Sequence, residues 1–339
     1  MKKLSWIDKI IFLVNSLFAF ALLLAYILPF VPPSFFPFLS LLSLGVPFLI
    51  IVNFLFLVFW AIRLKRQALL SLIVLLIGLH HVFSLFSFSS ETPKSSAKEI
   101  SIMSYNVHLF NKYRWIEKDS IPQQIKDFVK QEAPDILCVQ DYFKTDSISF
   151  DLFPYSYVQT KGKNTTSGQA IFSNFPIINK GSLDFPNTFN NAIFADIALE
   201  NDTIRVFNVH LESLKIIPEE VLEKEVSEKL IHRVGQAFVM QQKQTERLLK
   251  TIENTPYKSV ICADMNNSAF SYVYRKIENR GFKDAFKEAG NGFGKTYDFD
   301  FIPLRIDMIF VENPIRVTDF KNYEVQLSDH YPVMARFEL

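Results

Sequence analysis

The chain has 339 residues, of which 49% are hydrophobic, with 35 Phe, 10 Gly and 2 Cys. This apolar content excludes a disordered or collagen-like chain, and two cysteines exclude a disulfide scaffold. The net charge of +1 hides an asymmetry, because residues 1–98 carry +6 and residues 99–339 carry −5. At about 150 residues per domain, the length predicts about two units.

Three long apolar runs fill the first part of the chain, at about 7–28, 38–62 and 68–88. Each is about the 20 residues that a helix needs to cross a bilayer, and none shows a polar face at helical spacing. A cleavable signal peptide is the alternative for the first run, but a second apolar run follows without a small-residue cleavage site. We therefore expect residues 1–88 to form a membrane anchor of three transmembrane helices, with a kink at Pro47.

Basic residues precede the first run (Lys2, Lys3, Lys9) and separate the second run from the third (Arg63, Lys65, Arg66). The positive-inside rule places both clusters in the cytoplasm, although Lys94 and Lys98 weakly favour the reverse. We expect an integral, multi-pass membrane protein with a cytoplasmic N-terminus and an extracytoplasmic domain after the third span. His80 and His81 are expected to be a polar pair at the outer interface, with ligands or proton carriers as the alternative.

A short Ser-rich segment, 89–98, reads as a linker, and residues 99–339 are expected to form one water-soluble domain. Apolar runs predict strands at 102–107, 135–140, 169–174, 192–199, 204–211, 259–265, 305–311 and 333–339. Helices are predicted at 121–131 and, as a pair, within 218–253. Several strands follow one another without a helix between them, which favours mixed sheets covered by helices over a parallel doubly wound sheet.

Chemically capable side chains lie at or near the ends of these strands: Asn106, Asp141, His210, Asp264, Asn266, Asp307, Asp329 and His330. A single polar residue at a strand end is usually a turn or cap residue. Asp307 differs, because it lies between Ile306 and Met308 in a strand that should be buried. A carboxylate there needs a cation or a hydrogen-bond donor to offset its desolvation.

Together these residue types predict a class of reaction. The oxygen ligands of Asn106, Asp141 and Asp329 suit Mg²⁺ or Mn²⁺ and exclude a Cys-rich zinc site. The imidazoles of His210 and His330 suit proton transfer and oxyanion stabilisation. The chain has no Gly-rich phosphate loop and no G-x-S-x-G element. The reaction class that these residues still allow is metal-assisted hydrolysis with water as the nucleophile.

The ordered motifs SYNVH, PDILCVQD, GQAIFSNFPI, NVHLES, ICADMN, LRIDMIFV and LSDHYPV resemble the endonuclease/exonuclease/phosphatase superfamily. This superfamily includes DNase I-like nucleases, inositol polyphosphate phosphatases and neutral sphingomyelinases. The resemblance covers roughly 100–339. It implies a four-layer α/β sandwich, in which two packed mixed β-sheets are flanked by helices, preceded here by the three transmembrane helices.

The resemblance also implies a role for each matching residue. Asn106, Asp141 and Asp329 match metal-side positions. His330 matches the histidine that activates the attacking water, and Asp307 the carboxylate that orients this histidine. Asp264 and Asn266 match the pair that positions the nucleophile and the phosphate, and His210 the donor to a non-bridging phosphate oxygen.

Two positions depart from the pattern of the superfamily. Asp141 stands where Glu is usual, and with an unchanged backbone its carboxylate would lie about 1.5 Å further from the ion. This difference exceeds the ~0.2 Å tolerance of a ligand distance, so coordination requires either a bridging water or an adjustment of the loop. Ala263 stands where Gly is common, which carries a cost only if φ is positive there. Cys138 and Cys262 are expected to be buried on opposite faces and not to form a disulfide.

We expect a membrane-anchored, divalent-metal-dependent phosphoesterase whose partners are the bilayer and a phosphoester, with no protein partner predicted. A lipid head group is favoured, because the −5 domain offers no broad basic surface for nucleic acid and the anchor concentrates lipid near the site. An extracytoplasmic nuclease is the alternative, and an inactive membrane-tethered binding module is the second. The insert 212–253 is expected to be a helix pair packed on the domain, with Ile216, Ile217 and Phe238 touching lipid as the alternative.

Overall fold

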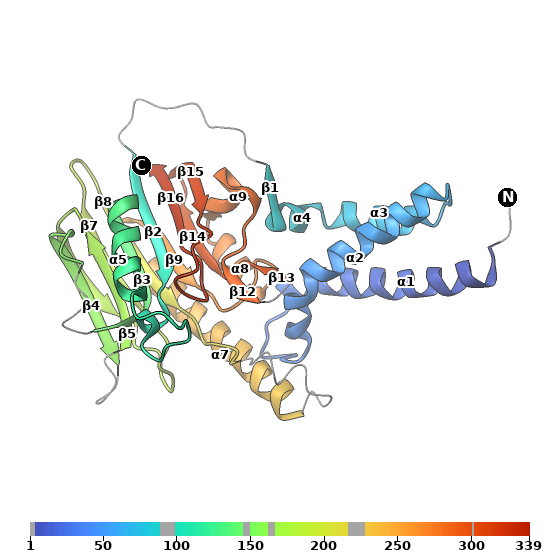
Figure 1. Cartoon of the computed structure of the whole chain (residues 1–339), viewed down its shortest axis with the longest axis horizontal. Helices are drawn as coiled ribbons and strands as arrows, with labels where there is room; N and C mark the ends of the chain where they lie inside the picture. Colours follow the sequence, from blue (N-terminus) through green and yellow to red (C-terminus); the bar gives the residue numbers. More distant parts are fainter. Residues whose placement is uncertain (1–3, 89–98, 145–149, 162–166, 216–227, 300–301) are drawn as a thin grey trace.

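The computed structural model describes residues 4–88, 99–144, 150–161, 167–215, 228–299 and 302–339. Apolar helices at the N-terminus project away from a larger unit built of two β-sheets (Figure 1). The predicted linker 89–98 lies outside the described residues, as do Ile216 and Ile217.

The N-terminal helices are α1 (Trp6–Ile27), η1 (Leu28–Phe30), η2 (Leu39–Leu41), α2 (Leu42–Ile62), α3 (Ala68–Ile77) and α4 (Leu79–Leu85). Two helical stretches, Trp6–Phe30 and Leu39–Ile62, are long and apolar enough to cross a membrane. Pro47 lies inside α2. These stretches coincide with the first and second predicted spans.

The third predicted helix, 68–88, is broken in the structure. α3 and α4 are bent by 75° at their junction, and Phe86–Phe88 form strand β1 instead of a last helical turn. Gly78 lies at the bend, where an added Cβ would lie 1.9 Å from the Tyr26 ring. Gly78 therefore has no room for a side chain. α3 and α4 are long and apolar enough to cross a membrane only when they are taken together as one bent span.

Buried polar side chains connect the three helices. The Asn15 amide in α1 donates to the Ser71 hydroxyl in α3 at 2.7 Å and accepts from the Trp60 indole in α2 at 3.1 Å. Asp8 in α1 pairs with Arg63 at the end of α2. In an apolar environment such bonds help to select which helix faces meet.

The larger unit contains two six-stranded mixed sheets. The order of the first is β15 (Arg316–Asn322), β16 (Val333–Glu338), β2 (Ile100–Asn106), β3 (Ile136–Phe143), β5 (Ser167–Ser173) and β4 (Tyr155–Lys161). The order of the second is β10 (Phe282–Asp284), β14 (Asp307–Glu312), β9 (Lys258–Asp264), β8 (Thr203–His210), β7 (Asn191–Ala198) and β6 (Ile177–Ser182). Each predicted strand run overlaps one of these strands.

Shorter elements complete the unit: η3 (His108–Asn111), α5 (Ile121–Glu132), α7 (Glu228–Glu253), α8 (Tyr272–Glu278), α9 (Ala285–Ala289), β11 (Asn291–Phe293), β12 (Tyr297–Phe299) and β13 (Ile302–Leu304). The predicted helix at 121–131 is α5. Of the insert 212–253, the described part contains the single long helix α7. Its Phe238 is buried against Leu41 and Leu44 of the N-terminal helices, so this side chain is covered by other helices and not exposed.

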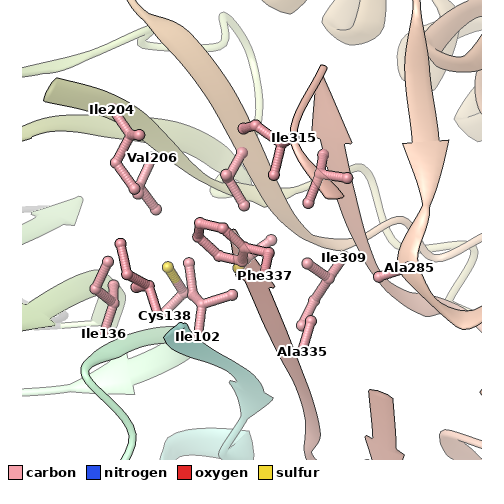
Figure 2. Packing of buried hydrophobic residues seen from close by; sticks show 14 of the residues in the cluster. Ile102, Ile136, Cys138, Ile204, Val206, Ala285, Ile309, Ile315, Ala335 and Phe337 are labelled. Carbon is pink, nitrogen blue, oxygen red and sulfur yellow. The ribbon is translucent and has the colours of Figure 1, made fainter. Parts of the chain in front are cut away.

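The two sheets face each other across an apolar core, in which Ile102, Ile136, Val206 and Phe337 meet (Figure 2). On the outer face of the first sheet, α5 buries Ile125 against the strands. On the outer face of the second, α7 and α8 do the same in a separate cluster. Helix, sheet, sheet and helix form the four layers that were predicted.

Cys138 and Cys262 lie in the core between the sheets with free thiols in contact with each other. The prediction that they lie on opposite faces is therefore wrong. That prediction counted residues back from Asp141, but β3 has a bulge between Val139 and Tyr142, so strict alternation does not extend through it.

Candidate active site

One parallel strand pair in each sheet brings polar residues to a common edge. β2 and β3 run parallel with Asn106 beside Gln140, and β8 and β9 run parallel with His210 beside Asp264. The carboxyl ends of parallel strands meet at the same edge, and the packed sheets bring the two pairs together. A hydrogen bond of 2.8 Å from the Asn106 amide to Asp264 joins them.

The Asp264 carboxylate is the centre of the site and is fully buried. Its Oδ2 accepts from Asn106 Nδ2 and lies 3.3 Å from His210 Nε2 and 3.9 Å from His330 Nε2. Its Oδ1 accepts from the Asn266 backbone amide at 2.9 Å. One carboxylate therefore connects four of the predicted site residues.

His330 and Asp307 form a buried pair. The two carboxylate oxygens of Asp307 lie 3.1 and 2.9 Å from His330 Nδ1. The Asp307 backbone amide donates to the Thr296 hydroxyl at 2.9 Å, and the Tyr297 ring stands edge-on to the imidazole. Burial alone lowers the pKa of His330, but the charges of Asp307 and Asp264 outweigh it and raise the pKa to about 10.

The interpretation of Asp307 as a paired carboxylate in a buried strand agrees with this geometry. Asp307 is directly opposite Asp264 in the antiparallel pairing of β14 with β9. Two buried carboxylates on adjacent strands would repel each other without a partner. Together with His330, they offer ligand atoms that all lie within 4.8 Å of one another.

Asp141 reaches the site through a distorted backbone. Its φ is +46°, at the bulge of β3, and its partly exposed carboxylate lies 3.5 Å from His210 Nδ1. A left-handed Asp is tolerated because its short polar side chain bonds locally. The bulge thus turns toward the site a side chain that regular alternation would point away from it.

Asp329 has a histidine partner that the sequence reasoning missed. The Nδ1 of His108 lies 2.8 Å from Asp329, and its ring stacks on Trp115 with 3.6 Å between centroids. Burial tends to raise the pKa of Asp329, but the His108 hydrogen bond and the charge of His330 lower it to about 2. His108 follows Asn106 within SYNVH, so proximity to a predicted ligand was its only signal in the sequence.

Asn266 lies at the edge of the cluster with φ of +46°, and its side-chain amide donates to the Leu211 carbonyl at 3.0 Å. The fully buried Gln241 of α7 donates to the Asn266 carbonyl at 3.2 Å and accepts from Asn267 at 2.7 Å. Gln241 was not predicted, because it lies within helix α7 and outside every motif at a strand end. Ala263 is not among the residues with positive φ, so its departure from Gly carries no strain.

The donor set fits a divalent cation. Within the described residues, the ion pairs that reach Asp141, Asp264, Asp307 and Asp329 all come from histidines. Four carboxylates carry more negative charge than three histidines can offset. Together with an amide oxygen, they place hard ligands in one region. Asn106, His210, Asp264, Asn266, Asp307 and His330 form one connected group. Asp141 joins it through His210, whereas Asp329 is held by His108.

Two parts of the chain match known sequence profiles. Residues 103–330 match the sequence profile of the Endonuclease/Exonuclease/phosphatase family, and residues 8–85 match a profile described only as a domain of unknown function. No curated protein matched the chain.

Solved structures share the fold over about 71% of the chain. An endonuclease/exonuclease/phosphatase from Bacteroides vulgatus is 18% identical, with a TM-score of 0.55 and 99% of its own chain covered. One from Beutenbergia cavernae DSM 12333 is 15% identical, with a TM-score of 0.54 and 72% covered. TDP2 of D. rerio, complexed with single strand DNA product, is 14% identical, with a TM-score of 0.52 and 100% covered.

Proposed function

Because this chain belongs to the endonuclease/exonuclease/phosphatase family of metal-dependent phosphoester hydrolases, we propose that His330 and Asp307 activate the attacking water in its reaction. The observation that carries this proposal is the buried pair itself, with 2.9 Å between His330 Nδ1 and Asp307. A divalent cation among the neighbouring carboxylates would oppose their charge and lower the pKa of His330, which favours the neutral imidazole. In that form, an Nδ1–H held by Asp307 leaves Nε2 as the proton acceptor. Nε2 points to the region of Asp264, the most connected carboxylate of the site.

The other residues take complementary roles in this proposal. Asp264 and Asn266 position the water and the phosphate, since both belong to the same hydrogen-bonded turn. His210 donates a hydrogen bond to a non-bridging phosphate oxygen, where negative charge increases during attack. Most of the rate enhancement comes from this fixed geometry and its electrostatics rather than from a covalent intermediate.

We propose Mg²⁺ or Mn²⁺ as the cation and Asn106, Asp141 and Asp329 as the residues that hold it. When bound, such an ion supplies positive charge for the phosphate and the leaving oxygen. The Asn106 amide oxygen accepts from the His108 backbone amide at 3.0 Å, which fixes the rotamer that faces the site. His108 likewise fixes the orientation of Asp329.

The domain organisation that we propose is a membrane anchor at 1–88, a linker at 89–98 and a catalytic domain at 99–339. The N-terminus is cytoplasmic and the catalytic domain extracytoplasmic, with α3 and α4 as the third, bent span. Basic residues flanking α1 and joining α2 to α3 support this orientation.

A reporter that fluoresces only in the cytoplasm tests this topology. Fused after Leu339, it is expected to remain dark, because three crossings place the C-terminus outside. Fused after Arg66 in a truncated chain, the same reporter should fluoresce and serves as the control. Fluorescence from the Leu339 fusion would contradict the extracytoplasmic assignment.

We favour a phosphodiester of a lipid head group as the substrate. The connection between α1 and α2 lies at the domain-facing end of these helices (Figure 1). Its Phe35, Phe36 and Phe38 are exposed. Aromatic side chains at the end of a membrane span are typical of the lipid interface. The helix that supports Asn266, α7, packs against this same connection, which supports a short distance between the site and the lipid surface.

A nuclease is the second candidate. Trp115 is 48% exposed while its ring stacks on His108 beside the site. An exposed aromatic ring at an active site can stack with a nucleic-acid base, and the TDP2 relative is described with a single strand DNA product. Nucleic acid is therefore included in the substrate panel.

The decisive assay offers DNA, RNA, sphingomyelin-like lipids and inositol phosphates to the full chain in detergent with Mg²⁺ or Mn²⁺. Hydrolysis of one class is expected, with complete loss after chelation by EDTA and recovery when either ion is restored. Cleavage of DNA alone would contradict the lipid assignment. A wild-type protein that is inert on the whole panel would contradict hydrolysis of these substrates and favour an inactive tethered module.

A further inference from the structure

The anchor contacts the catalytic domain directly after the Asn266 turn. The Ser268 hydroxyl donates to the Ser43 backbone carbonyl of α2 at 3.1 Å. Phe270, which is 3% exposed, lies in a hydrophobic cluster whose other buried members belong to α1, α2 and α3. Only one residue separates Asn266 from Ser268, so this contact fixes the end of the turn that holds Asp264.

A second contact lies beside Asp307. Arg305, two residues earlier, is buried, pairs with Asp284 at 2.7 Å and donates to the Ser84 backbone carbonyl of α4 at 3.3 Å. A buried guanidinium that reaches across two elements restrains both of them. The anchor therefore restrains the strand segment that leads into the carboxylate partner of His330.

A third contact is a strand pairing. β1, the last element of the anchor, pairs antiparallel with β11, and the rings of Phe86 and Phe293 meet edge-to-face at 4.7 Å. β11 leads directly to Thr296, whose hydroxyl accepts from the Asp307 amide, and to Tyr297, whose ring contacts His330. The segment that supports the catalytic pair is thus paired with the anchor.

Further contacts widen this interface without touching the site. Arg275 of α8 lies 3.7 Å from the Phe30 ring centroid, and Ser34 donates to Gln242 of α7 at 3.0 Å. His80, expected at the outer membrane interface, lies 3.2 Å from Lys287 of α9. The domain-facing ends of α1 and α2 accordingly lie against the catalytic unit (Figure 1).

We propose that the anchor forms one wall of the catalytic domain and positions the segments that carry Asn266, Asp307 and Thr296. Turnover therefore depends on docking of the anchor and not only on tethering to a membrane. Phe270 and Ser268 are positioning residues in this proposal, which rests on the proposed hydrolytic function. An undocked catalytic domain would expose Phe270 and leave the edge of β11 unpaired.

A cutting experiment tests docking by co-elution, which needs no assay of activity, and tests the effect of docking on turnover by kcat. A protease site is placed within 89–98 of the full chain in detergent, and the cut protein is passed over a size-exclusion column. The two pieces are expected to elute together, with kcat within about twofold of the uncut protein, because non-covalent contacts hold them. Separation of the pieces with full kcat in the released catalytic piece would overturn the proposal.

Two substitutions test positioning in the uncut full chain. Ser268→Ala and Phe270→Ala are each expected to lower kcat about tenfold with little change in KM, since small displacements of a catalytic turn cost rate rather than binding. Phe270→Leu restores apolar volume and should recover most of the loss. Phe20→Ala removes the same side chain from an exposed position of α1 and should leave kcat unchanged.

The outcomes separate this proposal from the proposed function. A wild-type chain that is inert on the substrate panel contradicts the function alone, and the cutting experiment still decides whether the anchor is docked. An active wild type with unchanged kcat in Ser268→Ala and Phe270→Ala overturns the positioning role alone. If Phe270→Ala does not fold, Ser268→Ala and the cut protein decide the question.

Discussion

His330→Ala is expected to lower kcat by about 10³-fold, because removal of a general base typically costs 10²- to 10⁴-fold. The substitution removes the only side chain that pairs with Asp307 and lies near Asp264 within the described residues. KM should change little, since the imidazole acts on the water and not on the substrate. The measurement is kcat and KM on the best substrate of the panel, in saturating Mg²⁺ or Mn²⁺.

Asp307→Asn provides a test of the pair. The amide keeps the shape of the carboxylate but cannot stabilise a positive imidazole, so a loss of similar size is expected. The double variant should be little worse than His330→Ala alone, because the two residues act as a unit. His232→Ala, an exposed histidine on α7, is the matched control. Equal activity of His330→Ala and wild type would contradict the assigned role of His330.

The central strands of both sheets could be predicted from the sequence because they are buried on both faces and read as apolar runs. β4, β6 and β15 were not predicted, and each lies at the edge of its sheet with exposed positions along it. An edge strand carries polar residues on one face and at its open side, so its pattern resembles a loop. None of these three edge strands contains a predicted site residue.

The proximity of most candidate site residues could also be predicted, because the motifs lie at the ends of buried strands whose register brings those ends together. The backbone geometry could not be predicted. The left-handed φ of Asp141 follows from a bulge that depends on the pairing of β3 with β5. The same bulge misled the assignment of the face of Cys138, since a strict alternation of two was assumed.

Contacts between distant segments could not be predicted either, because they too depend on how the elements pack. His108 meets Asp329 and Gln241 meets Asn266 only after the sheets have packed. The close approach of Gly78, at the bend between α3 and α4, to the Tyr26 ring likewise depends on another helix. A composition of uninterrupted apolar residues predicts a span but contains no information on which neighbour will approach it.

Asp264→Asn is expected to lower kcat by about 10³-fold while the protein remains folded. The amide has nearly the shape of the carboxylate, but it cannot accept hydrogen bonds at both terminal atoms. Asn106 Nδ2 and the Asn266 backbone amide both donate to this group, one to each oxygen, so one of them must lose its acceptor. The negative charge beside His210 and His330 is lost as well.

The same substitution should leave the thermal unfolding midpoint unchanged or raise it. Asp264 is fully buried and directly opposite Asp307, so its charge costs folding free energy that the histidines offset only in part. A residue kept for chemistry is expected to show this trade between stability and activity. Asp202→Asn, in a partly exposed pair with Lys258, is the control and should alter neither quantity. A lower midpoint together with retained kcat would instead identify Asp264 as a structural residue.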